Sequence, residues 1–205
     1  MTMPRILPSL AAIALVAGCA SKIDAPTQYD LGLLPAAAIA TPVATTAATI
    51  LPAISLADVN APAWLDNNMM FFRLAYANEQ QPRPYATSRW TMPPAQLFQQ
   101  RLKARMAQAG GAVLAMSDAA LNVPLLRIDM DDFTQTFDTP SHSVALLQVR
   151  ASLFNGRVLL AQKSFSSRAE TPSADAAGAA RAFVSANDAV IGDMMAWLAT
   201  VAPKR

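Results

Sequence analysis

The sequence has only one cysteine and one histidine among its 205 residues. A single cysteine cannot form a disulfide within the chain, and a single histidine cannot build a zinc site with several histidine ligands. Charged residues are also scarce, at 15%, and the 16 basic and 14 acidic residues leave a formal net charge of +2. No run of lysines and arginines concentrates the positive charge, so nucleic acid is not expected as a partner.

Long hydrophobic runs are missing as well, although 53% of the residues are hydrophobic. Alanine spreads this apolar content along the chain, and no stretch of about 18 uninterrupted apolar residues occurs. We therefore expect no transmembrane helix in the mature protein. The length favours one compact domain with tails, because a domain commonly has about 150 residues.

The N-terminus has the pattern of an export signal. Arg5 forms a short basic region, and a mostly apolar stretch over residues 6–16 follows it. This order predicts a signal peptide over residues 1–18. Residues 16–19 read Val-Ala-Gly-Cys and resemble the bacterial lipobox, so Cys19 is predicted to be acylated and to become the first residue of the mature protein. The alternatives are an ordinary secretory signal with a chance cysteine, or a buried thiol.

The predicted anchor also indicates a location. A diacylglyceryl group and an N-acyl chain together exceed the two signals that stable membrane attachment needs, because each buried CH₂ contributes about 0.8 kcal/mol. Ala20 and Ser21 follow Cys19, in place of the Asp that in many Gram-negative bacteria marks retention at the inner membrane. We therefore expect the protein to be lipid-anchored at the periplasmic face of the outer membrane.

The domain organisation follows from a change of composition. Residues 19–53 are predicted to form the lipid anchor and an Ala/Thr/Pro-rich linker, in which about 20 extended residues would reach roughly 70 Å. A surface loop lying on the domain is the alternative for the Ala/Thr/Pro-rich part. An α+β domain is predicted over residues 54–205, and Tyr29–Gly32 is a candidate for an added strand.

Periodicity predicts the elements of this domain. Apolar residues alternate over residues 54–58, 70–76, 126–131 and 145–153, which indicates strands, and residues 85–90 are a further candidate. Spacings of three and four predict one helix opened by Pro93-Pro94 and ended by Gly110-Gly111, and another capped by residues 171–173 and running to about Ala199. Asn155-Gly156 predicts a hairpin turn. The expected fold is α+β, a mostly antiparallel sheet with two amphipathic helices packed on one face, preceded by a lipidated tether.

Candidate catalytic and metal-binding groups are few. His142 follows a serine in a predicted hairpin, but no G-x-S-x-G motif accompanies it, and we interpret it as a solvent-facing residue. Asp129, Asp131 and Asp132 lie close together, yet they lack the glycine and terminal glutamate of a calcium loop. Alternating aspartates on a strand usually form a solvated face. We therefore predict no catalytic residue, no metal site and no cofactor.

Two other features have a structural interpretation. The run Met69-Met70-Phe71-Phe72 could line a path for lipid, but a strand buried on both faces is the interpretation we favour. Asn187 lies in the apolar stripe of the last predicted helix, where a buried amide needs hydrogen-bond partners. We expect it to fix a contact between helix and sheet.

Several short motifs follow the lipobox in a fixed order. They are Tyr29-Asp30-Leu31-Gly32, an Ala/Pro-rich linker, Ala61-Pro62-Ala63-Trp64-Leu65-Asp66, Phe72-Arg73-Leu74, Tyr85-Ala86 with Arg89-Trp90, and Pro93-Pro94 at a helix start. In this order the chain resembles the ABC-type transport auxiliary lipoprotein family, the Pqi-type membrane-integrity subunits. The resemblance covers nearly the whole mature chain.

The resemblance implies a periplasmic lipoprotein that works beside an ABC transporter and a mammalian-cell-entry-type (cell-entry-domain) protein. It implies no enzymatic activity and no active-site residues in this subunit. We therefore expect a non-enzymatic subunit of a system that moves lipids or hydrophobic compounds and maintains membrane integrity, and a homo-oligomer is left open. The alternatives are an assembly or scaffold lipoprotein of another envelope machine, and a lipoprotein hydrolase, against which the scarcity of histidine and cysteine weighs.

Overall fold

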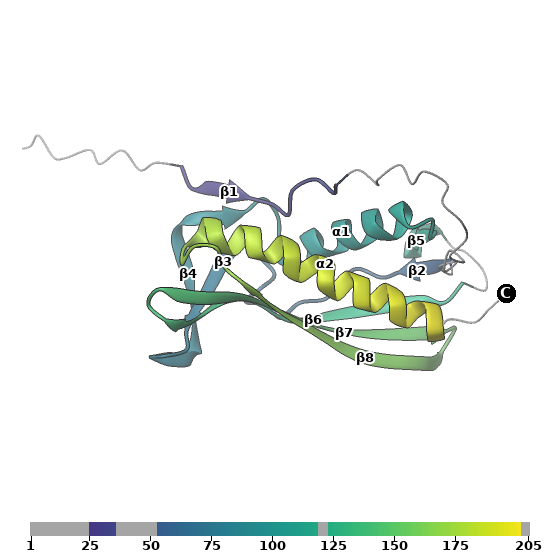
Figure 1. Cartoon of the computed structure of the whole chain (residues 1–205). Coiled ribbons are helices and arrows are strands. Elements are labelled where there is room, and N and C mark those ends of the chain that lie inside the picture. Colours follow the sequence, from purple (N-terminus) through teal and green to yellow (C-terminus); the bar gives the residue numbers. More distant parts are fainter. Residues whose placement is uncertain (1–24, 36–52, 119–122, 202–205) are drawn as a thin grey trace, which may run out of the picture.

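The computed structural model describes residues 25–35, 53–118 and 123–201. Eight strands, two α-helices and one 3₁₀ turn follow one another in this part of the chain. In order they are β1 (Thr27–Tyr29), β2 (Ile54–Leu56), β3 (Met69–Leu74), β4 (Asn78–Trp90), α1 (Pro94–Gln108), β5 (Val113–Ala115), η1 (Met116–Asp118), β6 (Leu125–Thr139), β7 (His142–Asn155), β8 (Val158–Glu170) and α2 (Ala176–Val201). Both helices lie on one side of the sheet (Figure 1). The predicted α+β class is confirmed.

The sheet is mixed, and β6 is its centre. Strand β7 pairs antiparallel with β6 along its length, and β8 pairs antiparallel with β7. On the other side of β6, β2 and β3 pair in parallel with its first and last parts, and β2–β5 and β1–β4 are parallel too. The sheet was predicted to be mostly antiparallel; its long pairings are antiparallel, but the shorter ones named above are parallel. Strand direction depends on the connection, because short turns join antiparallel neighbours, whereas parallel neighbours need long crossovers.

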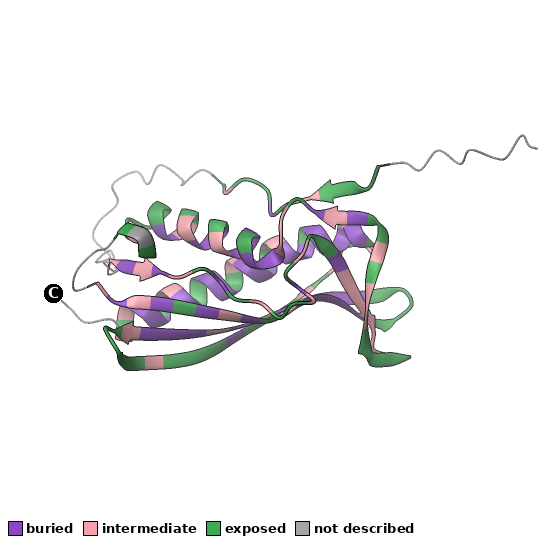
Figure 2. Ribbon diagram, turned by 180° about the vertical axis from the view of Figure 1, so that it is seen from behind, coloured by how far each residue is buried: buried purple, intermediate pink, exposed green. Residues whose placement is uncertain are grey.

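The core lies between the sheet and the helices, as the buried positions in Figure 2 show. The ring of Phe133 on β6 stacks on Phe183 of α2 with 3.9 Å between centroids, and Trp90 of β4 packs edge-on against both rings. These three aromatic side chains join two strands and the long helix. The opposite face of β6 and β7 carries the charged positions, so each of these strands has one apolar and one polar face, as expected.

The helix ends agree with the sequence in one case and differ in the other. In α1, Pro94 takes the first position and Gly110, with φ of +78°, follows the last turn, as predicted. The cap of α2 was predicted within residues 171–173, but the helix begins after Asp175. The Asp175 carboxylate accepts a hydrogen bond from the Gly178 backbone N–H at 2.6 Å, which is the contact of an N-cap.

The β7–β8 hairpin lies one residue away from its predicted turn. Asn155 pairs with Val158, so the two residues of the turn are Gly156 and Arg157, whereas Asn155-Gly156 was predicted. Gly156 has φ of +56°, a conformation that costs other residues energy. The glycine thus serves the turn from its first position.

Candidate functional site

A set of polar contacts around a buried arginine lies where the N-terminal segment meets the helices. Arg101 of α1 is buried, and its Nε and Nη2 donate hydrogen bonds to the two carboxylate oxygens of Asp188 on α2, at 2.8 Å each. Its Nη1 donates to the backbone oxygen of Leu31 at 2.7 Å. The planar guanidinium suits such a fork of acceptors. One side chain therefore joins both helices to the N-terminal segment.

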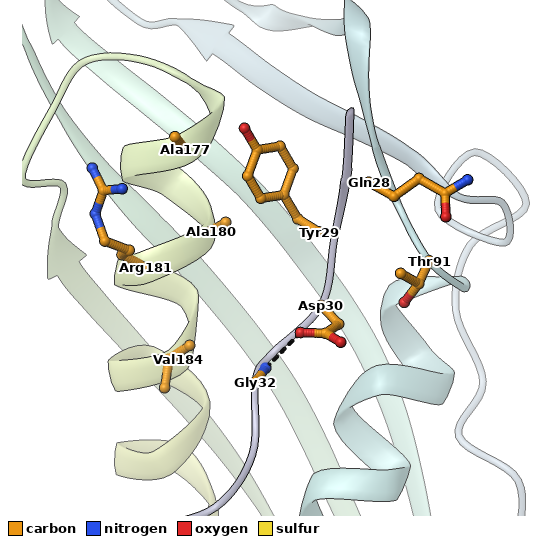
Figure 3. A pocket seen from close by; sticks show the side chains of 9 residues that line it. All are labelled: Gln28, Tyr29, Asp30, Gly32, Thr91, Ala177, Ala180, Arg181 and Val184. Atoms are coloured by element: carbon orange, nitrogen blue, oxygen red, sulfur yellow. Dashed lines mark hydrogen bonds between the residues drawn. The ribbon is translucent and has the colours of Figure 1, made fainter. Parts of the chain in front are cut away.

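Residues 25–35 are fixed to the rest of the domain at several points, and the stretch from Tyr29 to Gly32 passes between α2 and α1 (Figure 3). β1 pairs in parallel with the end of β4, Tyr29 opposite Trp90, and the side chain of Leu31 belongs to the buried core. Farther along, the Pro35 backbone oxygen accepts a hydrogen bond from Gln108 of α1 at 2.8 Å. This segment is consequently part of the folded unit.

The path of the segment depends on a local turn. The Asp30 carboxylate accepts a hydrogen bond from the Gly32 backbone N–H at 2.8 Å, and Gly32 has φ of +64°. The side chain of Asp30 thereby stabilises a left-handed backbone that glycine adopts at little cost. This hydrogen bond explains why a glycine stands two residues after the aspartate in Tyr29–Gly32.

Two cavities flank the segment. One, of about 340 Å³, lies between the segment and α2, where Tyr29 points toward Ala177 and Ala180, with Arg181 close by (Figure 3). The other, of about 540 Å³, lies between Leu33-Leu34 and α1.

Sequence reasoning did not single out Arg101 or Asp188, since Arg101 differs from its polar neighbours on α1 only through its tertiary contacts.

His142 lies at the start of β7 with a half-exposed side chain. Its Nδ1 is 2.6 Å from a carboxylate oxygen of Asp138, and its Nε2 is 2.6 Å from one of Glu170. The hydrogen bond that His142 donates to Asp138, followed by the charges of both carboxylates, raises the pKa of His142, and the same hydrogen bond lowers the pKa of Asp138. Because both ring nitrogens face acceptors, the geometry favours the imidazolium. The hydroxyl of Ser143 forms hydrogen bonds with Gln135 and Thr171 and not with this ring.

A chain of hydrogen bonds that the sequence did not reveal runs through Ser143. Its Oγ accepts from Nε2 of Gln135 at 2.8 Å and lies 2.7 Å from Oγ1 of Thr171, while Gln135 accepts from the Tyr85 hydroxyl at 2.6 Å. Burial and the charge of Asp175 raise the pKa of Tyr85 to about 12. The tyrosine is therefore a neutral donor, and this chain fastens β4, β6 and β7 to the segment before α2.

The three predicted surface aspartates have cationic neighbours. Asp129 and Asp131 lie 3.9 and 3.7 Å from the guanidinium of Arg150. Asp132 differs from the predicted solvated position, because its side chain is largely buried; it lies 3.6 Å from Arg73, and burial raises its pKa. Among the described residues, no group of three histidine, cysteine, aspartate or glutamate side chains could hold a metal ion.

The apolar run and the buried amide both differ from expectation. Met69 is exposed and Phe71 and Phe72 are half-buried, so β3 is not buried on both faces. Asn187 is fully buried, but its Nδ2 donates to the Phe183 backbone oxygen at 2.6 Å, one turn earlier in α2. Its hydrogen bond therefore lies within the helix and does not fix a contact with the sheet.

Cys19 lies outside the described residues, so its predicted acylation is not visible in the structure. Within residues 25–35, 53–118 and 123–201, neither helix is both long and apolar enough to cross a membrane.

Comparison with solved structures identifies the fold. A crystal structure of a Xanthomonas campestris protein of the DUF330 family is similar with a TM-score of 0.67 and 20% identity, over 84% of this chain and 95% of that one. A crystal structure of an uncharacterised protein is similar with a TM-score of 0.65 and 12% identity, over 85% and 99%. A comparison with curated proteins gave no significant match.

The match to a family model shows the family of the chain, whereas the similar structures show only its fold. The model of the ABC-type transport auxiliary lipoprotein component matches residues 29–195. The match begins at Tyr29, in the segment that Arg101 holds, and extends through most of α2, so it spans the folded unit. The chain therefore belongs to the family of ABC-type transport auxiliary lipoprotein components, which is a family of transport components and not of enzymes.

Proposed function

We propose that the chain is a subunit of an envelope system in which an ABC transporter and a cell-entry-domain protein move lipids or other hydrophobic compounds. It is anchored through Cys19 at the periplasmic face of the outer membrane, and it helps to maintain membrane integrity. Its role is to dock on its partners, and it performs no chemical step. The family match over residues 29–195 is the observation that carries this proposal.

The proposed organisation keeps a signal peptide over residues 1–18, an anchor and linker over 19–53 and a domain over 54–205, to which β1 adds a strand. The residues on either side of 36–52 are both hydrogen-bonded near the end of α1. Pro35 accepts from Gln108, and the Ile54 backbone N–H donates to the Ala112 oxygen at 3.0 Å. Residues 36–52 thus connect two points of one folded unit.

This arrangement shortens the reach of the tether. Only residues 20–26 separate the proposed anchor from β1, and extended residues span at most about 3.3 to 3.6 Å each, or roughly 25 Å in total. The end of the domain that carries β1 is therefore held close to the bilayer. Because Arg101 binds both Leu31 and Asp188, the segment next to the anchor is also fixed to α1 and α2.

Crosslinking in intact envelopes tests the proposal. A photo-reactive residue at Leu33, which is almost fully exposed, should capture the cell-entry-domain protein or a transporter component, identified by mass spectrometry. The matched control carries Cys19→Ser, which removes the anchor and should abolish the product. Crosslinks only to lipopolysaccharide-insertion or secretion components would support the scaffold alternative, and ester hydrolysis by the purified protein would support the hydrolase.

A further inference from the structure

The turn between β7 and β8 exposes a concentration of apolar side chains. Val158, Leu159 and Leu160 are consecutive and are 64%, 49% and 39% exposed. Leu159 pairs with Phe154, and Phe154 pairs with Leu125 of β6, so an apolar row crosses this end of the sheet. We call Leu125, Phe154 and Val158–Leu160 the apolar tip. Single exposed leucines are common, whereas a contiguous exposed set indicates contact with another surface.

Two cations border the apolar tip, and a third lies on the other face of β8. Arg157 occupies the turn, and the guanidinium of Arg127 lies 5.1 Å from the ring centre of Phe154. Lys163 pairs with Ala151 of the buried face, and its ammonium lies over the ring of Phe165. None of the three forms an ion pair with another described residue. The tip therefore presents positive charge without a counter-charge from the described part of the chain.

The charge balance changes within a short distance along the same face. Arg150 lies farther from the turn and has the carboxylates of Asp129 and Asp131 beside it. Apolar surface and unbalanced positive charge thus coincide only at the end of the sheet. A surface that combines exposed aliphatic groups with negative charge would be complementary to this end.

A strand from another protein is the rival occupant, since β8 is an edge strand among the described strands. Beyond Leu160 the strand is mostly polar and carries Lys163 and Arg168. Charged side chains, lysine above all, discourage the pairing of an edge with another strand. The apolar surface is gathered at a projecting turn and does not follow the edge, which favours a lipid surface over an added strand.

We propose that the apolar tip and its two cations, Arg127 and Arg157, bind the interface of a bilayer that contains anionic phospholipid. The aliphatic side chains enter the boundary between headgroups and acyl chains, and the two arginines bind the lipid phosphates.

This contact is separate from the proposed anchor. The turn and β1 lie at opposite ends of the molecule (Figure 1), and α2, with 26 residues or about 39 Å, runs between these ends. The protein therefore has two lipid contacts, and the second does not depend on any transport partner.

Fluorescence quenching by brominated lipid tests the contact. The processed lipoprotein carrying Leu159→Trp is reconstituted in vesicles of phosphatidylglycerol and phosphatidylcholine. Bromine is placed either in the same bilayer or in separately added vesicles. The matched control is Gln81→Trp, an exposed position of β4, in the same background of three native tryptophans. We expect the fluorescence of the tryptophan at position 159 to be quenched by bromine in the same bilayer or in the added vesicles. The fluorescence of the Gln81→Trp control should not be quenched in either case.

Charge dependence is the second measurement. Arg157→Gln in the reporter background should weaken the contact about fivefold, because one basic residue near an anionic surface contributes about that factor. Replacing all phosphatidylglycerol by phosphatidylcholine should weaken it further. Val158→Trp serves as a second reporter where Leu159→Trp melts at a lower temperature than the native chain.

Three results would overturn the proposal. The first is no quenching of either reporter in either arm with native melting. The second is quenching that does not change when phosphatidylglycerol is removed. The third is crosslinking of the tip to a second copy or to a strand of another protein without quenching, which would assign the tip to a protein partner.

Discussion

The Nε and Nη2 of Arg101 donate to different oxygens of the Asp188 carboxylate at the same distance, 2.8 Å, so one bidentate ion pair joins α1 to α2. The side chain of Arg101 is only 3% exposed, whereas that of Asp188 is 29% exposed. Water can therefore reach the carboxylate but not the guanidinium. Removing the carboxylate leaves a buried cation without its partner, which costs more than losing an exposed pair.

We therefore expect Asp188→Asn to lower the free energy of unfolding by about 3 kcal/mol, measured by urea denaturation. The matched control is Asp193→Asn, an exposed position of the same helix with no ion pair among the described residues, for which the change should stay within about 0.5 kcal/mol. Equal effects of the two substitutions would contradict the structural role of the pair.

Two glycines of α2 should respond to alanine with opposite signs. A Cβ at Gly178 would overlap the backbone oxygen of Ser173, so Gly178→Ala should lower the melting temperature. A Cβ at Gly192 meets nothing, and Gly192→Ala should stabilise the helix by roughly 0.5 to 1 kcal/mol. Thermal unfolding of both variants checks this pair. The same sign for both would place the start of α2 elsewhere.

Local signals in the sequence were sufficient where one residue fixes the backbone. The helix α1 begins at Pro94 and ends before Gly110, as predicted, because proline favours the first turn of a helix and glycine favours the residue that follows the last turn. The cap of α2 was predicted within residues 171–173, and the packed structure places it at Asp175. The hairpin turn shifted by one residue, since Gly156 satisfies a positive φ at either position of the turn.

Contacts between distant segments could not be predicted in this way. Arg101 lies beside the apolar stripe of α1, and nothing local distinguishes it from Lys103 or Arg105. Its burial depends on Asp188, 87 residues later, and on Leu31, 70 residues earlier. The parallel pairing of β2 and β3 with β6 has the same origin, because hydrophobic alternation carries no information on strand direction.

The ion pairs of His142 should depend on pH in a defined direction. Its pKa is raised above 6.5, so their contribution is complete below that pH and is lost as the pH rises through the raised pKa. The pKa of Asp138 is lowered from 3.8, so its part is present above that pH and is lost as the pH falls through the lowered value. Because Asp138 is the largest cause, Asp138→Asn should lower the pKa of His142, followed by NMR, more than Glu170→Gln does. The reverse order would contradict the geometry.

The proposed anchoring depends on the only thiol of the chain. Cys19→Ser should abolish labelling with a palmitate analogue, because no other cysteine can be acylated. The control is Ser21→Ala, which keeps residues 16–19 and should remain labelled in the outer-membrane fraction. Ala20→Asp should stay labelled but move to the inner membrane. Unchanged labelling of Cys19→Ser would contradict the anchor.

A docking subunit should tolerate the loss of its candidate chemical groups. His142→Ala, Asp129→Asn and Asp131→Asn change exposed or half-exposed side chains, whose ion pairs are screened by water, so each should complement a strain that lacks the gene. Envelope integrity is scored as sensitivity to detergent. Arg101→Met should lower the protein level or the partner crosslinking, because the substitution releases the N-terminal segment from both helices. This variant should therefore fail to complement the strain. Failure of His142→Ala at a normal protein level and with normal crosslinking would instead indicate chemistry at the β6–β7 turn.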